Sequence, residues 1–187
     1  MLVLLPGLDG TGKLLTTFVQ ALAQVLCAPW ETQVIAYPKD EPLGYDELER
    51  RVRGALPDDR PFVLLAESFS GPIAIRIAAS PARAMRGVIL CGTFARNPYP
   101  LLGGSSGLPG AHQVAASLGS GAAHVGLEER GPRARASGAR HRPSGRCGGQ
   151  TPHQGAVIDG PHLLLQAAPQ ECAAAVGQWL LRQPGFT

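Results

Sequence analysis

A serine with small neighbours lies where the sequence changes from a strand pattern to a helix pattern. Phe62–Leu65 is an apolar run that favours a short buried strand, and the isoleucines and alanines up to Ala79 favour a helix packed on a sheet. Ser68, between them, has small residues at positions −2, +2 and +3. A turn this abrupt lifts the Ser68 side chain clear of the sheet, and the helix N-terminus behind it favours negative charge. The same pattern also fits a serine that only caps a helix.

A glycine-rich loop follows the first apolar run of the chain. Leu2–Leu5 predicts a buried strand, and the glycines within Pro6–Gly12 favour tight turns. Gly7–Lys13 also matches most of a P-loop, whose backbone N–H groups cradle phosphates. Leu14 stands where that motif needs Ser or Thr, and the strand Val88–Cys91 ends without the Asp that would complete a Mg²⁺ site. A P-loop-like nucleotide binder is therefore an alternative hypothesis.

A histidine follows the last predicted strand. Ala156–Asp159 is a short strand pattern, and a helix is predicted from about Pro169 to Leu181. His162 lies in the loop between them, where an imidazole could accept a proton and return it. A lone histidine in a loop is more often structural or merely exposed. The other histidines show no metal-like spacing: His112, His124, His141 and His153.

Alternating strands and helices must position these residues. Helices are predicted over Leu14–Leu26, over Tyr45–Leu56 and after Ser68. Strands are predicted over Leu2–Leu5, Gln33–Tyr37, Phe62–Leu65 and Gly87–Cys91. This order implies right-handed crossovers and a mostly parallel sheet with helices on both faces.

Together these stretches resemble the α/β-hydrolase superfamily. The turn around Ser68 is similar to its nucleophile elbow, with Ala66 and Ser70 where the common form has glycine. Pro6 and Gly7 lie where many members have His-Gly in the oxyanion loop. The pairing of Pro-Gly-x-Asp-Gly-Thr-Gly with Glu-Ser-Phe resembles a subgroup of bacterial serine hydrolases and the acyltransferases that make phytyl and other fatty esters.

The resemblance implies a set of roles. Ser68 would be the nucleophile and His162 the proton acceptor, and the backbone N–H groups of Leu8 and Phe69 would form the oxyanion hole. The implied function is hydrolysis of a small-molecule carboxylic ester, or acyl transfer, through an acyl-serine intermediate. The resemblance implies no metal or organic cofactor.

The segment from Leu102 to Gly155 departs from the family. Thirteen of the chain's 24 glycines fall there, and no apolar run resembles a strand. The strand and the acid that orient the catalytic histidine are expected in this region. The remaining candidates for that acid are Asp159, Glu128 and Glu129.

We therefore expect a single domain over 1–187, with a recognisable core at 1–101 and 156–183 and an irregular segment at 102–155. That segment could be a disordered insertion or a GC-rich region translated out of frame. Activity would then be weak, and a damaged hydrolase without catalysis is a further alternative.

The length and composition of the chain limit the classes of protein to which it can belong. The length of 187 residues and the hydrophobic content of 44% suit one domain with a sizeable core. The net charge is +3, and the arginines cluster in one window without interleaved aromatics: Arg130, Arg133, Arg135, Arg140, Arg142 and Arg146. We therefore expect no nucleic-acid partner.

The four cysteines lie far apart, and the start of the chain lacks a signal-peptide pattern, so we expect a cytoplasmic protein without a membrane span. The sequence does not indicate an oligomeric state.

Overall fold

The computed structural model describes residues 1–26, 30–93, 123–129, 153–159 and 161–183, and it describes only the backbone at 123–129, 153, 154 and 157. Six strands form one parallel sheet in the order β2-β1-β3-β4-β5-β6. Their bounds are Leu2–Leu5 (β1), Thr32–Val34 (β2), Phe62–Glu67 (β3), Met85–Cys91 (β4), Ala123–Glu129 (β5) and His153–Ile158 (β6).

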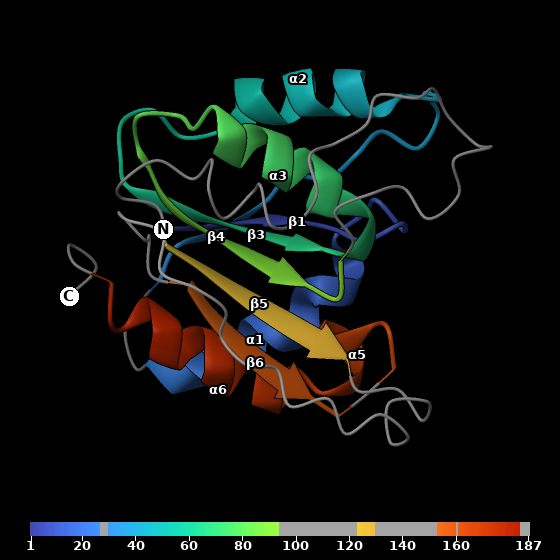
Figure 1. The fold of residues 1–187 in the computed structure, drawn as a ribbon. Coiled ribbons are helices and arrows are strands. Elements are labelled where there is room, and N and C mark those ends of the chain that lie inside the picture. The colour runs from blue at the N-terminus through green and yellow to red at the C-terminus, as the bar shows by residue number, and fades with distance from the viewer. Residues whose placement is uncertain (27–29, 94–122, 130–152, 160, 184–187) are drawn as a thin grey trace, which may run out of the picture.

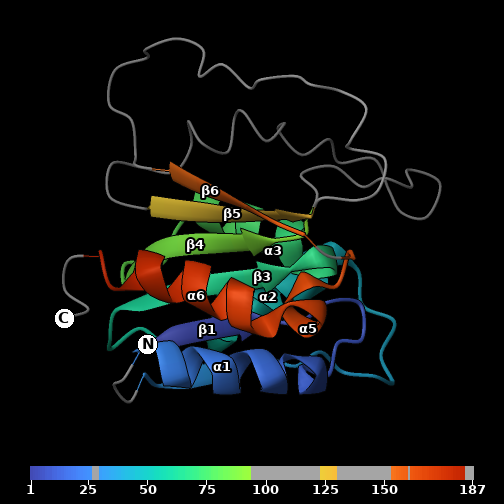
Figure 2. The same cartoon turned by 90° about the horizontal axis from the view of Figure 1, so that it is seen from below.

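Helices cover both faces of this sheet. They are α1 (Thr16–Leu26), α2 (Tyr45–Ala55), α3 (Gly71–Ala79), α5 (Leu164–Ala167) and α6 (Pro169–Leu180), with 3-10 turns η1 (Lys13–Leu15) and η2 (Ser68–Ser70). The pair α2 and α3 lies on one face, and α1, α5 and α6 lie on the other (Figures 1 and 2). The predicted parallel sheet covered on both faces is therefore confirmed.

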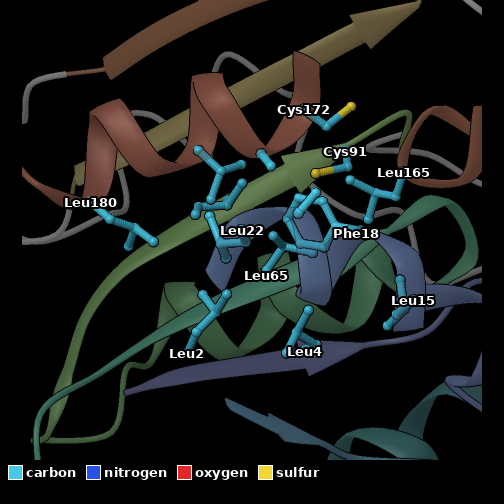
Figure 3. Close-up of a cluster of buried hydrophobic side chains, with 14 of the residues drawn as sticks. Leu2, Leu4, Leu15, Phe18, Leu22, Leu65, Cys91, Leu165, Cys172 and Leu180 are labelled. Atoms are coloured by element: carbon cyan, nitrogen blue, oxygen red, sulfur yellow. The ribbon is translucent and has the colours of Figure 1, made fainter. Parts of the chain in front are cut away.

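The central strands are apolar because both of their faces are buried. All four residues of β1 are fully buried, and their side chains alternate between two hydrophobic clusters. Leu2 and Leu4 pack with Phe18 and Leu22 of α1 (Figure 3), whereas Val3 and Leu5 pack on the side of α2 and α3. A continuous apolar run, and not an alternating one, is the pattern that such a strand needs.

The chain reverses its direction across the sheet between β1 and β3. It runs from β1 outward to β2, returns to β3 on the other side of β1, and then continues to β4, β5 and β6. In parallel α/β sheets, ligands bind outside the carboxyl ends of the strands at such a point. The loop after β1 and the turn after β3 meet there, and these are the two stretches that the sequence singles out.

The sequence shows no strand pattern between Leu102 and Gly155, but two strands nevertheless reach into this segment. Strand β5 lies inside that segment, and β6 begins at His153, earlier than the predicted strand. The sequence of β5 has few apolar residues, so its extended state depends on the parallel ladders that β4 and β6 supply on either side. The predictions for 102–122 and 130–152 fall outside the described residues.

Strand β2 is shorter than predicted, because its continuation turns to the first loop. The N–H of Ile35 still donates to the Leu4 carbonyl at 3.0 Å, but the N–H of Tyr37 donates to the Gly10 carbonyl at 2.7 Å. Tyr37 therefore belongs to the surroundings of the loop after β1. Within the described residues, no helix is both long and apolar enough to cross a membrane.

Candidate active site

Ser68 lies in a strained turn directly after β3. Its φ is 45°, and among the described residues it is the single non-glycine residue with positive φ. Such a conformation persists only where the surrounding structure enforces it. The Thr93 hydroxyl donates to the Ser68 carbonyl at 2.7 Å, and a Cβ at Gly71 would overlap that hydroxyl. Glycine at this position is therefore a condition for the turn.

Ser68 and His162 are in hydrogen-bonding contact, although 94 residues separate them. The Ser68 Oγ lies 2.7 Å from the His162 Nε2. Ser68 is 8% exposed, and His162 lies at the surface. This is the distance that a nucleophile and its general base require. A neutral imidazole whose Nε2 accepts the serine proton must carry its own proton on Nδ1.

The histidine loop is held by its neighbours. The N–H groups of Gln166 and Ala167 donate to the carbonyl of Leu163, which lies between His162 and the first residue of α5, Leu164. Gly92, which follows β4, approaches so closely that a Cβ there would lie 2.9 Å from the His162 carbonyl oxygen. The position of His162 thus depends on both α5 and the end of β4.

The loop after β1 is attached to the turn by Ser70. This serine is fully buried, and its hydroxyl donates to the Pro6 carbonyl. The Tyr37 hydroxyl lies 2.5 Å from the Ser70 Oγ and must be the donor there, because a serine has one hydroxyl proton. Burial raises the pKa of Tyr37, so its hydroxyl stays protonated. From the sequence, Ser70 is recognisable only as a small residue near Ser68. Its hydrogen bonds are visible only in the tertiary structure.

Leu8 and Phe69, the expected oxyanion donors, lie on two different segments. Leu8 follows Gly7 in the attached loop, and its side chain is 81% exposed. Phe69 follows Ser68, and its ring stacks on Tyr45 with the centroids 5.0 Å apart. The Tyr45 hydroxyl donates to the Phe69 carbonyl at 3.4 Å. The Phe69 backbone is thus held by Tyr45, and the loop that carries Leu8 is attached to the turn through Pro6.

The same loop is a poor phosphate cradle. The N–H of Thr11 donates to the Asp9 carboxylate at 3.1 Å, the N–H of Lys13 to the Thr11 hydroxyl at 3.1 Å, and the N–H of Gly10 to the Gly7 carbonyl at 3.1 Å. A P-loop needs such N–H groups for the phosphates, and the Asp9 carboxylate would repel them. The structure therefore disfavours the nucleotide hypothesis.

The three candidate acids lie at the carboxyl ends of the last two strands of the sheet. Glu128 and Glu129 end β5, paired in register with Val157 and Ile158 of β6. Asp159 follows β6 and is exposed. Their backbones lie at the same edge of the sheet as His162, but the side chains of Glu128 and Glu129 are outside the description.

Glu67 is a site residue that the sequence analysis used only as part of a motif. It directly precedes Ser68, is 2% exposed, and accepts a hydrogen bond from the Gln166 Nε2 at 3.1 Å. Burial raises the pKa of its carboxyl group. A charged residue type at the end of an otherwise apolar strand was the available signal. Within the described part of the chain, no cluster of three His, Cys, Asp or Glu residues could hold a metal ion.

Comparison with known proteins identifies the fold. No family model matches the chain, and no curated protein matches it. Among solved structures, NosK from Streptomyces actuosus is similar with a TM-score of 0.70 at 20% identity, covering 97% of each chain. Carboxylesterase CesB from Bacillus subtilis has a TM-score of 0.63 at 13% identity, covering 100% of this chain and 84% of its own. An extracellular alpha/beta-hydrolase from a Paenibacillus species has a TM-score of 0.56 at 13% identity, covering 95% of this chain and 97% of its own. The chain therefore has the α/β-hydrolase fold.

Proposed function

We propose that this protein is a serine hydrolase that cleaves carboxylic esters through an acyl-Ser68 intermediate. The main support is the 2.7 Å contact between the Ser68 Oγ and the His162 Nε2 at the carboxyl end of β3. A serine that only capped a helix would need neither this contact nor a φ of 45°. The similarity of the fold to a carboxylesterase agrees with this chemistry.

The reaction uses groups of this chain. The His162 Nε2 accepts the Ser68 hydroxyl proton while the Oγ attacks the ester carbonyl carbon. The carbonyl oxygen becomes an oxyanion, which the N–H groups of Leu8 and Phe69 stabilise. Protonated His162 then gives its proton to the departing alkoxide, leaving acyl-Ser68. Water repeats these steps and releases the acid, and an alcohol in its place would give acyl transfer.

Labelling with a fluorophosphonate tests this function directly. The wild-type protein should form a covalent adduct, and Ser68→Ala should abolish it, as seen by intact mass. His162→Ala should lower the labelling rate to nearly the same level, because a nucleophile and its base act as a unit. Ser80→Ala is the matched control, since Ser80 is an exposed serine at the end of α3. Labelling that survives Ser68→Ala would refute the proposal.

A further inference from the structure

A buried carboxyl group beside the nucleophile has no part in the mechanism above. Glu67 is 2% exposed at the end of β3, and glutamate is almost never buried so fully unless it is paired. No lysine or arginine of the described residues forms an ion pair with it. The side chain that donates to it is a neutral amide, because the Gln166 Nε2 lies 3.1 Å from the Glu67 Oε2.

Two oxygen atoms of this pair remain unsatisfied. The Glu67 Oε1 and the Gln166 Oε1 are both buried, and neither has a hydrogen-bond partner within the described residues. If Glu67 is ionised, both atoms are acceptors and cannot satisfy each other. A proton on the Glu67 Oε1 turns that atom into a donor. A carboxylic acid and an amide can then exchange two hydrogen bonds in a ring, and both unsatisfied oxygens gain a partner from one proton.

The surroundings of the pair favour the neutral acid. Burial has the largest effect and raises the pKa of Glu67, and the Asp9 carboxylate acts in the same direction. The hydrogen bond from Gln166, the charge of His162 and a hydrogen bond from the Gly7 backbone act in the opposite direction.

Among the described residues, two thiols also interact with Glu67. They are Cys91 of β4 and Cys172 of α6, and both are buried. Burial raises the pKa of each thiol, so both stay neutral near pH 7. Among the described residues, His162 is the one basic group whose charge acts on Glu67.

We propose that Glu67 is protonated in the folded protein near neutral pH and forms a neutral, doubly hydrogen-bonded pair with Gln166. Glu67 precedes Ser68, and Gln166 lies in α5, which begins directly after the histidine loop. Gly7, whose Cβ would lie 3.4 Å from the Glu67 Oε2, precedes Leu8. The pair thus positions the segments that carry the nucleophile, the base and one oxyanion donor. Its positioning role rests on the proposed function, whereas its protonation does not.

The sign of the pH dependence follows from the raised pKa. The folded protein binds this proton more tightly than the unfolded chain, in which the glutamate pKa is near 4.5. The free energy of unfolding therefore falls as the pH rises from that value through the higher folded pKa. Labelling should decline as the pH rises through the folded pKa of Glu67, because Glu67 then loses its proton and the pair opens.

Two substitutions separate a neutral Glu67 from a charged one. Glu67→Gln cannot ionise, but its amide can donate to the Gln166 Oε1 and accept from the Gln166 Nε2. It should keep the labelling rate of the wild type and remove the alkaline decline. Glu67→Ala removes both hydrogen bonds and should lower the rate about tenfold. Glu41→Gln is the matched control at an exposed position, and its pH profile should equal that of the wild type.

Infrared spectroscopy detects the proton without any activity. The difference between the infrared spectra of the wild type and of Glu67→Gln should show the C=O band of a carboxylic acid near neutral pH. The same band should appear when both proteins also carry Ser68→Ala. Absence of the band would overturn the proposal, as would a Glu67→Gln rate as low as that of Glu67→Ala. If the wild type is not labelled at all, the proposed serine hydrolase function is refuted. The infrared band still shows whether Glu67 is protonated.

Discussion

Ser68 and His162 are in contact, but the two ends of the site are built differently. Ser68 follows β3, whose six residues are all buried, and its turn is held by residues close to it in the sheet. His162 follows β6, in which Gly155 is exposed and Ala156 is half-buried. Ser68, the proposed nucleophile, thus lies at the centre of the sheet, and His162 lies at its edge.

At the histidine end, helix packing makes up for the exposed edge strand. Leu164 and Leu165 of α5 and Val176 and Leu180 of α6 are almost fully buried against α1 and the sheet. Figure 2 shows α1 and α6 side by side on this face. A nucleophile can therefore be placed by a strand and a turn, whereas the histidine needs a second layer to place it. Substitutions at the two ends should differ accordingly.

The largest effect is expected at the histidine end, from the missing acid. Isosteric substitutions remove each candidate charge in turn: Glu128→Gln, Glu129→Gln and Asp159→Asn. The one that is the acid should lower the rate of ester hydrolysis about 10⁴-fold, because the histidine loses its correct tautomer. The other two should leave the rate unchanged. If all three rates equal that of the wild type, the chain works without an acid, and its activity should then be weak.

An intermediate effect is expected at the nucleophile end, from Gly71. Gly71→Ala places a Cβ on the Thr93 hydroxyl, which holds the Ser68 carbonyl. The substitution should lower the free energy of unfolding by about 1–3 kcal/mol and should also slow labelling. Urea denaturation measures the first change, and the fluorophosphonate measures the second.

Gly54→Ala is the matched control for this substitution. A Cβ there meets no atom within 4 Å, and Gly54 lies inside α2. It should raise the free energy of unfolding by about 1 kcal/mol and leave labelling unchanged, because alanine favours the helix. Equal losses at Gly54 and Gly71 would show that the turn has no special need for glycine.

A smaller effect is expected where Ser70 joins the loop to the turn. Ser70→Ala removes the hydrogen bonds to the Pro6 carbonyl and from the Tyr37 hydroxyl. The free energy of unfolding should fall by about 1 kcal/mol, and labelling should slow because the Leu8 backbone loses its anchor. Unchanged labelling at reduced stability would show that Ser70 is structural only. Ser80→Ala serves again as the control.

Much of the nucleophile end was predictable from the sequence because its signals are local. The apolar run of β3, the small residues around Ser68 and the glycines after β1 each act within a few residues of the chain. They indicate the fold and the turn. Leu14 weakens the P-loop alternative in the sequence, but the choice depends on the partners of the loop N–H groups, such as the Asp9 carboxylate that accepts from the Thr11 N–H.

The sequence by itself determined the apolar strands, the glycine-dependent turn and the residue types that can exchange a proton. Only the tertiary structure decided that Ala123–Glu129 forms a strand, that His162 meets Ser68 and that Glu67 meets Gln166. The physical reason is the range of the interactions. Burial and turn geometry leave a pattern in neighbouring residues, whereas strand pairing and side-chain contacts join residues that are nearly 100 positions apart.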